Sequence, residues 1–211
     1  MNDFDRKQHW EHIYSTKSLH EVSWYQPTPE ITLNFFQQLD IPLKSNIIDV
    51  GGGDSSLVDH LLDIGYRNLT VLDISEVAIE KAKQRLGERA DLVNWLVTDI
   101  ADFMPEDTYE VWHDRAAFHF LTEEKEIEKY IETAYRSLSP DGILIMGTFS
   151  EDGPTKCSGI EIKQYSEASL TDRMKRFFEK IHCLKVDHKT PSGSIQSFLF
   201  CAFRRATVKA H

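Results

Sequence analysis

The sequence lacks the long apolar runs that mark membrane proteins and the signals that mark secreted ones. None of its apolar stretches approaches the ~20 residues that span a bilayer. Its polar start, MNDFDRKQHWEH, has no basic region followed by an apolar stretch. These absences argue against a membrane helix and a secretory signal, and they predict a cytoplasmic protein without a membrane partner.

Cysteine is scarce as well, with three residues in the whole chain, Cys157, Cys183 and Cys201. None of them has the C-x-x-C spacing of a zinc site, and the set does not suggest a disulfide framework. We therefore expect no metal site and reduced, unpaired thiols. Cys183 and Cys201 would come near each other if a hairpin turn is centred on Ser192.

Positive charge is also in short supply, because 24 basic residues face 34 acidic ones and the formal net charge is -10. Such a balance opposes the phosphate neutralisation that nucleic acid demands, so we expect no nucleic-acid partner. The 211 residues suit one domain, residues 1–211, without repeats or linkers. The oligomeric state is left open.

What the chain does contain is an alternation of short apolar strands and helix-period segments. A closing pair of apolar segments, 181–188 and 195–203, is joined by a turn too short for a parallel crossover, so it predicts an antiparallel hairpin. The pattern predicts an α/β three-layer sandwich, a mostly parallel sheet with helices on both faces. The other expected strands are 46–50, 69–72, 92–97, 109–112 and 143–149, with helices at 56–64 and 76–86 among those between them.

A triple glycine lies between the first strand and its helix, in the stretch NIIDVGGGDSSL. Glycine permits the tight turn and the close approach of backbone to a ligand that such a loop requires. The dinucleotide pattern G-x-G-x-x-G would need glycine where Ser56 stands, and the phosphate-loop signature is absent. What remains is the pattern acidic-x-Gly-x-Gly, made by Asp49, Gly51 and Gly53.

Two further acids, Asp73 and Asp99, follow the second and third strands, one βα unit apart. Ligands of open α/β sheets bind at the carboxyl ends of the strands, so these carboxylates should line one crevice. A nucleotide with hydroxyls, a cationic centre and an amino group, but no phosphate, suits that edge.

On these residues the chain resembles the class I S-adenosylmethionine (SAM)-dependent methyltransferases. IIDVGGGDSSL resembles the first motif of that family and GYRNLTVLDISEVAIEKAK its second. The resemblance implies a Rossmann-like seven-stranded sheet, SAM as methyl donor and S-adenosyl-L-homocysteine (SAH) as product. It divides the chain into an N-terminal helix and aromatic lid (1–28), a SAM-binding core (46–150), and a C-terminal helix and β-hairpin (166–205).

The resemblance also implies roles for the residues of the donor site. Gly51 and Gly53 would approach the amino acid part of SAM, Asp49 would hold its amino group, and Asp73 would bind the ribose hydroxyls. The plainer alternatives are a tight turn for the glycines, a structural pair for Asp49 and a helix cap for Asp73, although Ser75 fills that last role better.

The adenine would meet three more residues in this resemblance. Ile74 would pack on the ring, and Asp99 with Ile100 would address its edge. Asp99 has an alternative role as a turn residue. The run Asp73-Ile74-Ser75 and the leader W-x-x-x-Y with SWYQ resemble the branch with elongation-factor lysine methyltransferases. That branch tends to read Asp-Lys-Gly after strand four, where this chain reads His-Asp-Arg at 113–115.

Four aromatic residues near the N-terminus, Trp10, Tyr14, Trp24 and Tyr25, are candidates for a lid over the acceptor. A sulfonium is attracted to aromatic faces, and water must be kept from the methyl in transfer. The alternative is ordinary packing in the core. Cys157, in the loop after strand five, is interpreted as inert because no base is adjacent in the sequence.

Three residues at or beyond the end of strand four, His113, Asp114 and His119, are candidate acid–base groups because an acceptor would meet the methyl there. His119 has packing against its aromatic neighbours as the alternative. Methyl transfer is an in-line displacement that depends mainly on alignment, so a base is optional. An amine or hydroxyl acceptor would need one, for which Asp114 is the candidate, and a thiol would not.

We therefore expect a SAM-dependent methyltransferase that acts on a small molecule, since the core fold uses almost the whole chain. A protein lysine is the alternative acceptor. A nicotinamide-dependent oxidoreductase and a SAM-binding protein without catalysis are alternatives of other classes. Ser56 and the terminal hairpin both count against the oxidoreductase.

Overall fold

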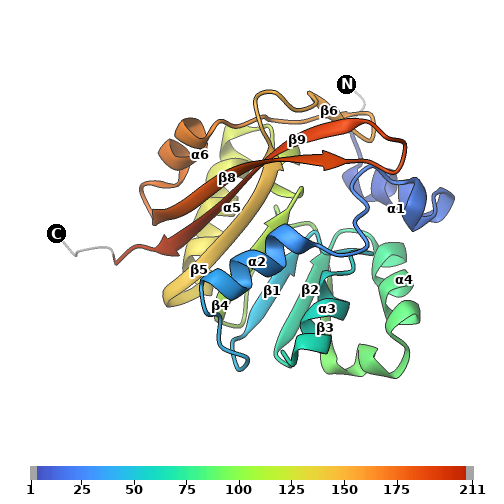
Figure 1. Ribbon diagram of the computed structural model, residues 1–211, viewed down its shortest axis with the longest axis horizontal. Helices are drawn as coiled ribbons and strands as arrows, with labels where there is room; N and C mark the ends of the chain where they lie inside the picture. Colours follow the sequence, from blue (N-terminus) through green and yellow to red (C-terminus); the bar gives the residue numbers. More distant parts are fainter. Residues whose placement is uncertain (1–3, 208–211) are drawn as a thin grey trace.

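A computed structural model describes residues 4–207, which form a seven-stranded sheet with helices on both faces (Figure 1). The strand order is β3-β2-β1-β4-β5-β9-β8. The first five of these strands are parallel, and β9 runs antiparallel to both β5 and β8. The strands are β1 (Ile47–Val50), β2 (Leu69–Asp73), β3 (Val93–Val97), β4 (Tyr109–Arg115), β5 (Leu138–Phe149), β8 (Phe178–Lys189) and β9 (Ile195–Arg205). The predicted α/β architecture and its closing hairpin are confirmed.

The helices divide between the two faces of the sheet and bury an apolar cluster on each. Phe36 of α2, Leu61 of α3 and Ile79 of α4 belong to one cluster, whereas Tyr130 of α5 and Leu170 of α6 belong to the other. The helices are α1 (Arg6–Thr16), α2 (Glu30–Gln38), α3 (Leu57–Ile64), α4 (Glu76–Leu86), α5 (Glu124–Ser137) and α6 (Glu167–Met174). A small hairpin, β6 (Lys156–Cys157) and β7 (Ile160–Glu161), follows β5.

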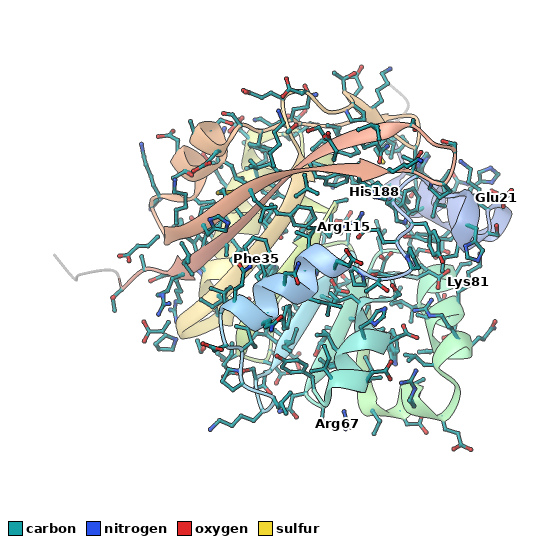
Figure 2. All side chains as sticks on the ribbon, in the orientation of Figure 1. Glu21, Phe35, Arg67, Lys81, Arg115 and His188 are labelled. Carbon is teal, nitrogen blue, oxygen red and sulfur yellow. A yellow bond between two sulfur atoms is a disulfide. The ribbon has the colours of Figure 1, made fainter. Side chains whose placement is uncertain are left out.

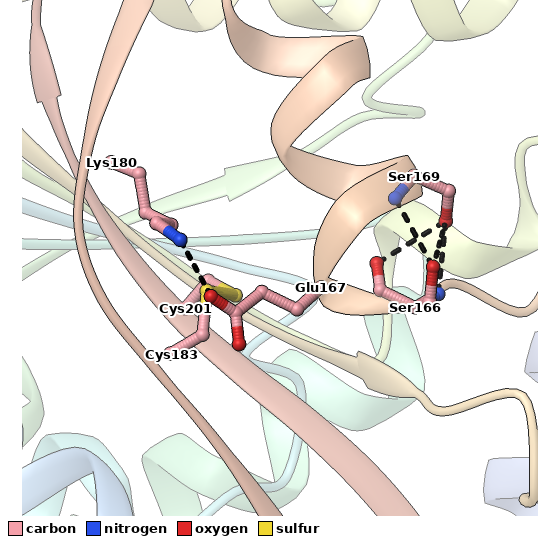
Figure 3. Close-up of a disulfide and its surroundings, with 6 residues drawn as sticks. All are labelled: Ser166, Glu167, Ser169, Lys180, Cys183 and Cys201. Carbon is pink, nitrogen blue, oxygen red and sulfur yellow. Dashed lines mark hydrogen bonds and ion pairs between the residues drawn. A yellow bond between two sulfur atoms is a disulfide. The ribbon is translucent and has the colours of Figure 1, made fainter.

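The β8–β9 hairpin corrects one expectation about the cysteines. Its register places Cys183 directly opposite Cys201, as a turn centred on Ser192 requires, with their Cα atoms 4.1 Å apart. The two form a disulfide, so the expectation of reduced, unpaired thiols was wrong for them (Figure 3). The cause is the pairing register, which puts both side chains on one face of the sheet. Cys157 is a free, buried thiol.

The strand order creates a crevice beside β1. The chain adds β2 on one side of β1 and β4 on the other, so the loops that leave β1 and β4 part at this point. In Figure 1, α1 lies at this end of the sheet beside α4. Within residues 4–207, no helix has both the length and the apolar composition needed to cross a bilayer.

Candidate functional site

A cavity opens at the carboxyl ends of β1, β2 and β4, beneath α1. Eight of the predicted site residues line it, namely Trp10, Tyr14, Trp24, Gly51, Asp73, Ile74, Asp99 and Ile100. The predicted residues that are not among the lining residues are Tyr25, Asp49, Gly53, His113, Asp114 and His119.

The glycine loop after β1 has a backbone that only glycine adopts without strain. Gly51 has a φ of +67°, and a Cβ added there would lie 2.6 Å from the Cβ of Ala117. Gly53 has a φ of +42°, and its added Cβ would lie 2.7 Å from Oδ2 of Asp73. Both positions therefore reject side chains, which keeps the loop close to the cavity and to the β2 carboxylate.

Asp73 is the buried carboxylate at the end of β2. Its Oδ1 accepts a hydrogen bond from the backbone N–H of Ser75 at 2.8 Å. Burial raises the pKa of Asp73 to about 7, and the nearby carboxylates of Asp49 and Glu11 add to the rise. Ser75 itself caps α4 by accepting from the N–H of Ala78 at 3.1 Å. Asp73 is thus left with an oxygen for a ligand.

Asp99, at the end of the β3 segment, contributes the second acidic group of the cavity wall. Its Oδ1 accepts from the N–H of Ala101 at 2.8 Å, and its Oδ2 lies 3.6 Å from a guanidinium nitrogen of Arg6. Arg6 also pairs with Glu126 of α5 at 2.5 Å. The carboxylate of Asp99 is therefore fixed in position by both a turn and an arginine from α1.

Asp49 lies behind the glycine loop and makes a structural pair. The β1–β4 register places it opposite His113, and its Oδ1 is 2.6 Å from Nδ1 of that ring. The other ring nitrogen, Nε2, is 3.0 Å from Oγ1 of Thr32 on α2. Both Asp49 and His113 are buried, and Oδ1 of Asp49 and both ring nitrogens of His113 are used in this chain of contacts.

Asp114 points to the opposite face of β4 and holds the turn after the strand. Its Oδ1 accepts from the N–H groups of Ala117 at 2.9 Å and Phe118 at 3.1 Å. The hydroxyl of Tyr130 donates to its Oδ2 at 2.6 Å. Burial raises the pKa of Asp114 to about 6, and the Tyr130 bond opposes that rise. Asp114 therefore holds the turn after β4, whose residue Ala117 lines the cavity.

His119 follows in a short helical turn and is fully buried. Its ring stacks on Phe149 with centroids 4.7 Å apart and an interplanar angle of 21°. Burial lowers the pKa of His119 to about 3, and the nearby Arg115 cation lowers it further, so the ring is neutral. Neither ring nitrogen has a partner among residues 4–207. The alternative of a packing histidine matches this environment.

The aromatic residues of the N-terminal segment close the top of the cavity. Trp10 meets Trp24 edge to face at 5.8 Å and Phe120 at 5.0 Å, and Tyr14 meets Trp24 at 6.1 Å. Such edge-on contacts give a rigid apolar cover. Tyr25 instead packs on His20 at 4.6 Å, outside this cover.

Helix α1 carries that cover and is fastened along its length. Glu11 accepts from the N–H groups of Glu76 at 2.8 Å and Val77 at 3.1 Å, at the N-terminus of α4. Lys81 of α4 donates to the carbonyl oxygens of Tyr14 and Lys17 at the C-terminal end of α1. The carboxylate of Glu11 therefore lies at the N-terminus of α4, where the helix dipole favours a negative charge.

Arg115 is the main lining residue that the sequence analysis missed. It borders the cavity near the middle of the view in Figure 2. Its Nη1 donates to the carbonyl oxygen of Trp24 at 3.0 Å, and its Cζ lies 5.3 Å from the centroid of the Phe198 ring. Its position at the end of a buried strand was a usable signal. Phe149, Cys157 and Phe198 complete this wall, and their approach depends on the fold of β5, β6 and β9.

Comparisons with known proteins show which proteins this chain is similar to. Residues 47–142 match the family described as a methyltransferase domain. The eEF1A lysine and N-terminal methyltransferase of Mus musculus is 28% identical over 127 residues, 59% of this chain and 18% of that protein. Malonyl-(acyl-carrier protein) O-methyltransferase 2 of Ilyobacter polytropus is 27% identical over 108 residues, 51% of this chain and 40% of that protein. The chain thus spans less than half of either relative.

Two solved structures share the fold. The N-methyltransferase NodS of Bradyrhizobium japonicum, in complex with SAH, has a TM-score of 0.71 at 16% identity, over 96% of this chain and 100% of that chain. A protein solved in work on the conversion of a disulfide bond into a thioacetal group during echinomycin biosynthesis has a TM-score of 0.77 at 16% identity, over 96% of this chain and 94% of that one. At this identity the likeness concerns the fold alone.

Proposed function

We propose that this protein, whose residues 47–142 match the family described as a methyltransferase domain, transfers the methyl group of SAM to a small molecule held in the cavity beneath α1. The observation that carries the proposal is the division of this cavity. One end has two carboxylates, two isoleucines and Arg6, which pairs with Asp99, and the other end has aromatic rings and Arg115. A donor and an acceptor of different chemistry fit such a cavity side by side.

The residues at the first end fit the donor. An added Cβ at position 51 or 53 would collide with Ala117 or with Asp73, so only glycine lets the loop take this path, beside which the amino acid part of SAM would lie. Asp73 offers a buried carboxylate oxygen to the ribose hydroxyls. Ile74 and Ile100 provide apolar faces for adenine, with Asp99 at its edge. Asp49 supports the loop through His113 rather than from the cavity wall.

The acceptor's lone pair forms the new bond to the methyl carbon while the carbon–sulfur bond breaks and its electron pair stays on sulfur, which leaves SAH. The chain's part is to align the two reactants and to exclude water with Trp10, Tyr14 and Trp24.

Burial raises the pKa of Cys157 to about 11, so this thiol is protonated and is a poor base. Asp114 and His113 are committed to other contacts. We therefore favour an acceptor that loses its proton to solvent, as a thiol does.

A small acceptor fits the cover over the cavity. Tyr14 is 8% exposed, and the rings of Trp10, Trp24 and Phe120 contact one another above the site. A lysine on a folded protein would have to reach the methyl through this cover.

The observation that favours a protein acceptor is the sequence relationship to the eEF1A lysine and N-terminal methyltransferases. Methylation of a purified elongation factor with labelled SAM, compared with a pool of small thiols and amines, separates the two.

The first test is calorimetric titration of the protein with SAM, SAH and NADH. We expect micromolar binding of the two sulfur nucleotides and its loss in Asp73→Asn. Asp172→Asn, an exposed carboxylate on α6 that pairs with Lys175, is the matched control and should bind as the wild type does. Binding of NADH instead would favour the oxidoreductase, and SAM binding without turnover on any acceptor would favour a non-catalytic role.

A further inference from the structure

The acceptor end of the cavity contains one cation, Arg115, among apolar neighbours. It is the last residue of β4, and side chains alternate along a strand, so it lies on the same face as His113 and opposite Asp114. Around it lie Trp24, Phe198 and the free thiol of Cys157. The carboxylates of Asp73 and Asp99 belong to the donor end. Arg6 also lines the cavity, but it pairs with Asp99 and Glu126 and so differs from Arg115.

The guanidinium of Arg115 has too few partners for a buried cation. Nη1 donates to the carbonyl oxygen of Trp24, whereas Nε and Nη2 are buried without a hydrogen-bond partner among the residues that the structure describes. No carboxylate within residues 4–207 forms an ion pair with it. Burial lowers the pKa of Arg115 only to about 10, so the group is charged at neutral pH. Buried charges in proteins are normally paired.

The carboxylate that acts on Arg115 electrostatically is Asp49. It is already bonded to His113 at 2.6 Å, and it reaches the guanidinium through space only. The centroid of the Phe198 ring lies 5.3 Å from Cζ of Arg115. The ring carries no lone pair, so Nε and Nη2 of Arg115 gain no hydrogen-bond acceptor from it. A planar carboxylate offers the two oxygens that this fork lacks.

We propose that Arg115 binds a carboxylate of the methyl acceptor, so that the substrate is a small organic acid with an apolar, preferably aromatic, body. The proposal rests on the methyltransferase function above and names its substrate class. The acid would neutralise Arg115, while Trp24, Phe149 and Phe198 would contact the body of the molecule. The carboxylate of the donor is the competing source of the same chemistry, and the experiment separates the two.

The test uses the full chain loaded with SAH. It is titrated with benzoate, phenylacetate, 3-phenylpropionate and indole-3-acetate, and with the primary amide of each acid. We expect at least one acid to bind at least tenfold more tightly than its amide, and we expect Arg115→Met to remove that preference. Equal binding of acids and amides, or no binding of either by the wild type, would overturn the proposal without any variant.

Two control variants and one measurement of melting temperature complete the design. Arg205→Met removes another arginine that donates to a carbonyl oxygen and lies over an aromatic ring, outside the cavity, and it should keep the acid preference. Arg115→Lys keeps the charge without the fork and should keep part of the preference. A merely structural Arg115 would lower the melting temperature on change to Met and leave the acid preference intact.

Titration with SAH and with 5′-methylthioadenosine, which has no carboxylate, identifies the competing source. If Arg115→Met weakens SAH at least tenfold and leaves methylthioadenosine unchanged, the arginine holds the donor and the proposal is overturned. If the wild type binds no SAH, the methyltransferase function itself fails. Normal SAH binding without a preference for acids refutes the role of Arg115 alone.

Discussion

Asp73→Asn should stabilise the free protein and weaken its binding of the donor, two opposite effects of one change. The carboxylate is 5% exposed, and burial raises its pKa from 3.8 to about 7. At ~1.36 kcal/mol per pKa unit, this shift of roughly three units corresponds to about 4 kcal/mol of unfolding free energy lost when the group is charged. Asparagine keeps an oxygen for the N–H of Ser75 and carries no charge.

The sign of the pH dependence follows from the same shift. Because the folded-state pKa lies above the unfolded one, the folded protein binds more protons between about pH 4 and pH 7. The contribution of Asp73 to stability is present below that range and is lost as the pH rises through about 7. The stability difference between Asp73→Asn and the wild type should therefore be about 1.6 kcal/mol near pH 5 and grow to a maximum of roughly 4 kcal/mol above pH 8.

Urea unfolding of both proteins at pH 5 and pH 8.5 measures this difference, and calorimetry with SAH measures the cost in binding. Hydrogen bonds to a charged group contribute ~1.5–3 kcal/mol each, so the loss of one predicts at least tenfold weaker binding. In the wild type, SAH affinity should also fall as the pH is lowered from 8.5 to 6, because Asp73 becomes protonated. A variant that is less stable than the wild type at pH 8.5, or that binds SAH equally well, would refute the reasoning.

Three other perturbations test neighbouring parts of the structure. Gly51→Ala meets both a positive φ and a contact of 2.6 Å, so it should cost more than the ~1–3 kcal/mol of strain alone. Gly159→Ala, with a φ of +82° and open space, supplies the strain-only control in thermal melts, and SAH binding should be lost in the first variant alone. Asp114→Ala leaves three donors without their acceptor and should cost about 3 kcal/mol or more in urea unfolding. SAH affinity of the folded variant should stay near that of the wild type, and a large loss would place this carboxylate nearer the ligand than its contacts indicate. Ellman titration of the denatured chain should find one thiol before reduction and three after it. Reduction of Cys183–Cys201, 18 residues apart, should lower stability by up to ~3 kcal/mol, and three thiols without reductant would contradict the disulfide.

The elements around the candidate site could be predicted because their signals are local. Apolar alternation, helix periodicity and the short turn between 189 and 195 are read within a window of a few residues. The glycines after β1 and the acids after β2 and β3 are tied to the ends of those strands by the chain itself. Parallel strands bring their carboxyl ends to one edge, so Gly51, Asp73 and Asp99 had to come together once the alternation was recognised.

The acceptor side could not be predicted in the same way. His113, Asp114 and Arg115 are consecutive, and a shift of one residue along a strand exchanges its two faces. Asp114 was the candidate base from position alone, yet its partners Ala117, Phe118 and Tyr130 hold it on the far face. What surrounds each of the three residues depends on elements distant in the chain.

The sequence by itself determined the order of strands and helices, the glycine loop and the acidic edge that points to a nucleoside, because each rests on short-range periodicity or on the end of one strand. Only the tertiary structure decided that Asp49 is paired with His113, that Cys183 is bonded to Cys201, and that Arg115 faces the cavity without a counter-ion among residues 4–207. These outcomes depend on pairing register, on strand faces and on burial by segments more than 50 residues away for Asp49 and Arg115. Such long-range packing is a property of the whole folded chain, and no local pattern records it.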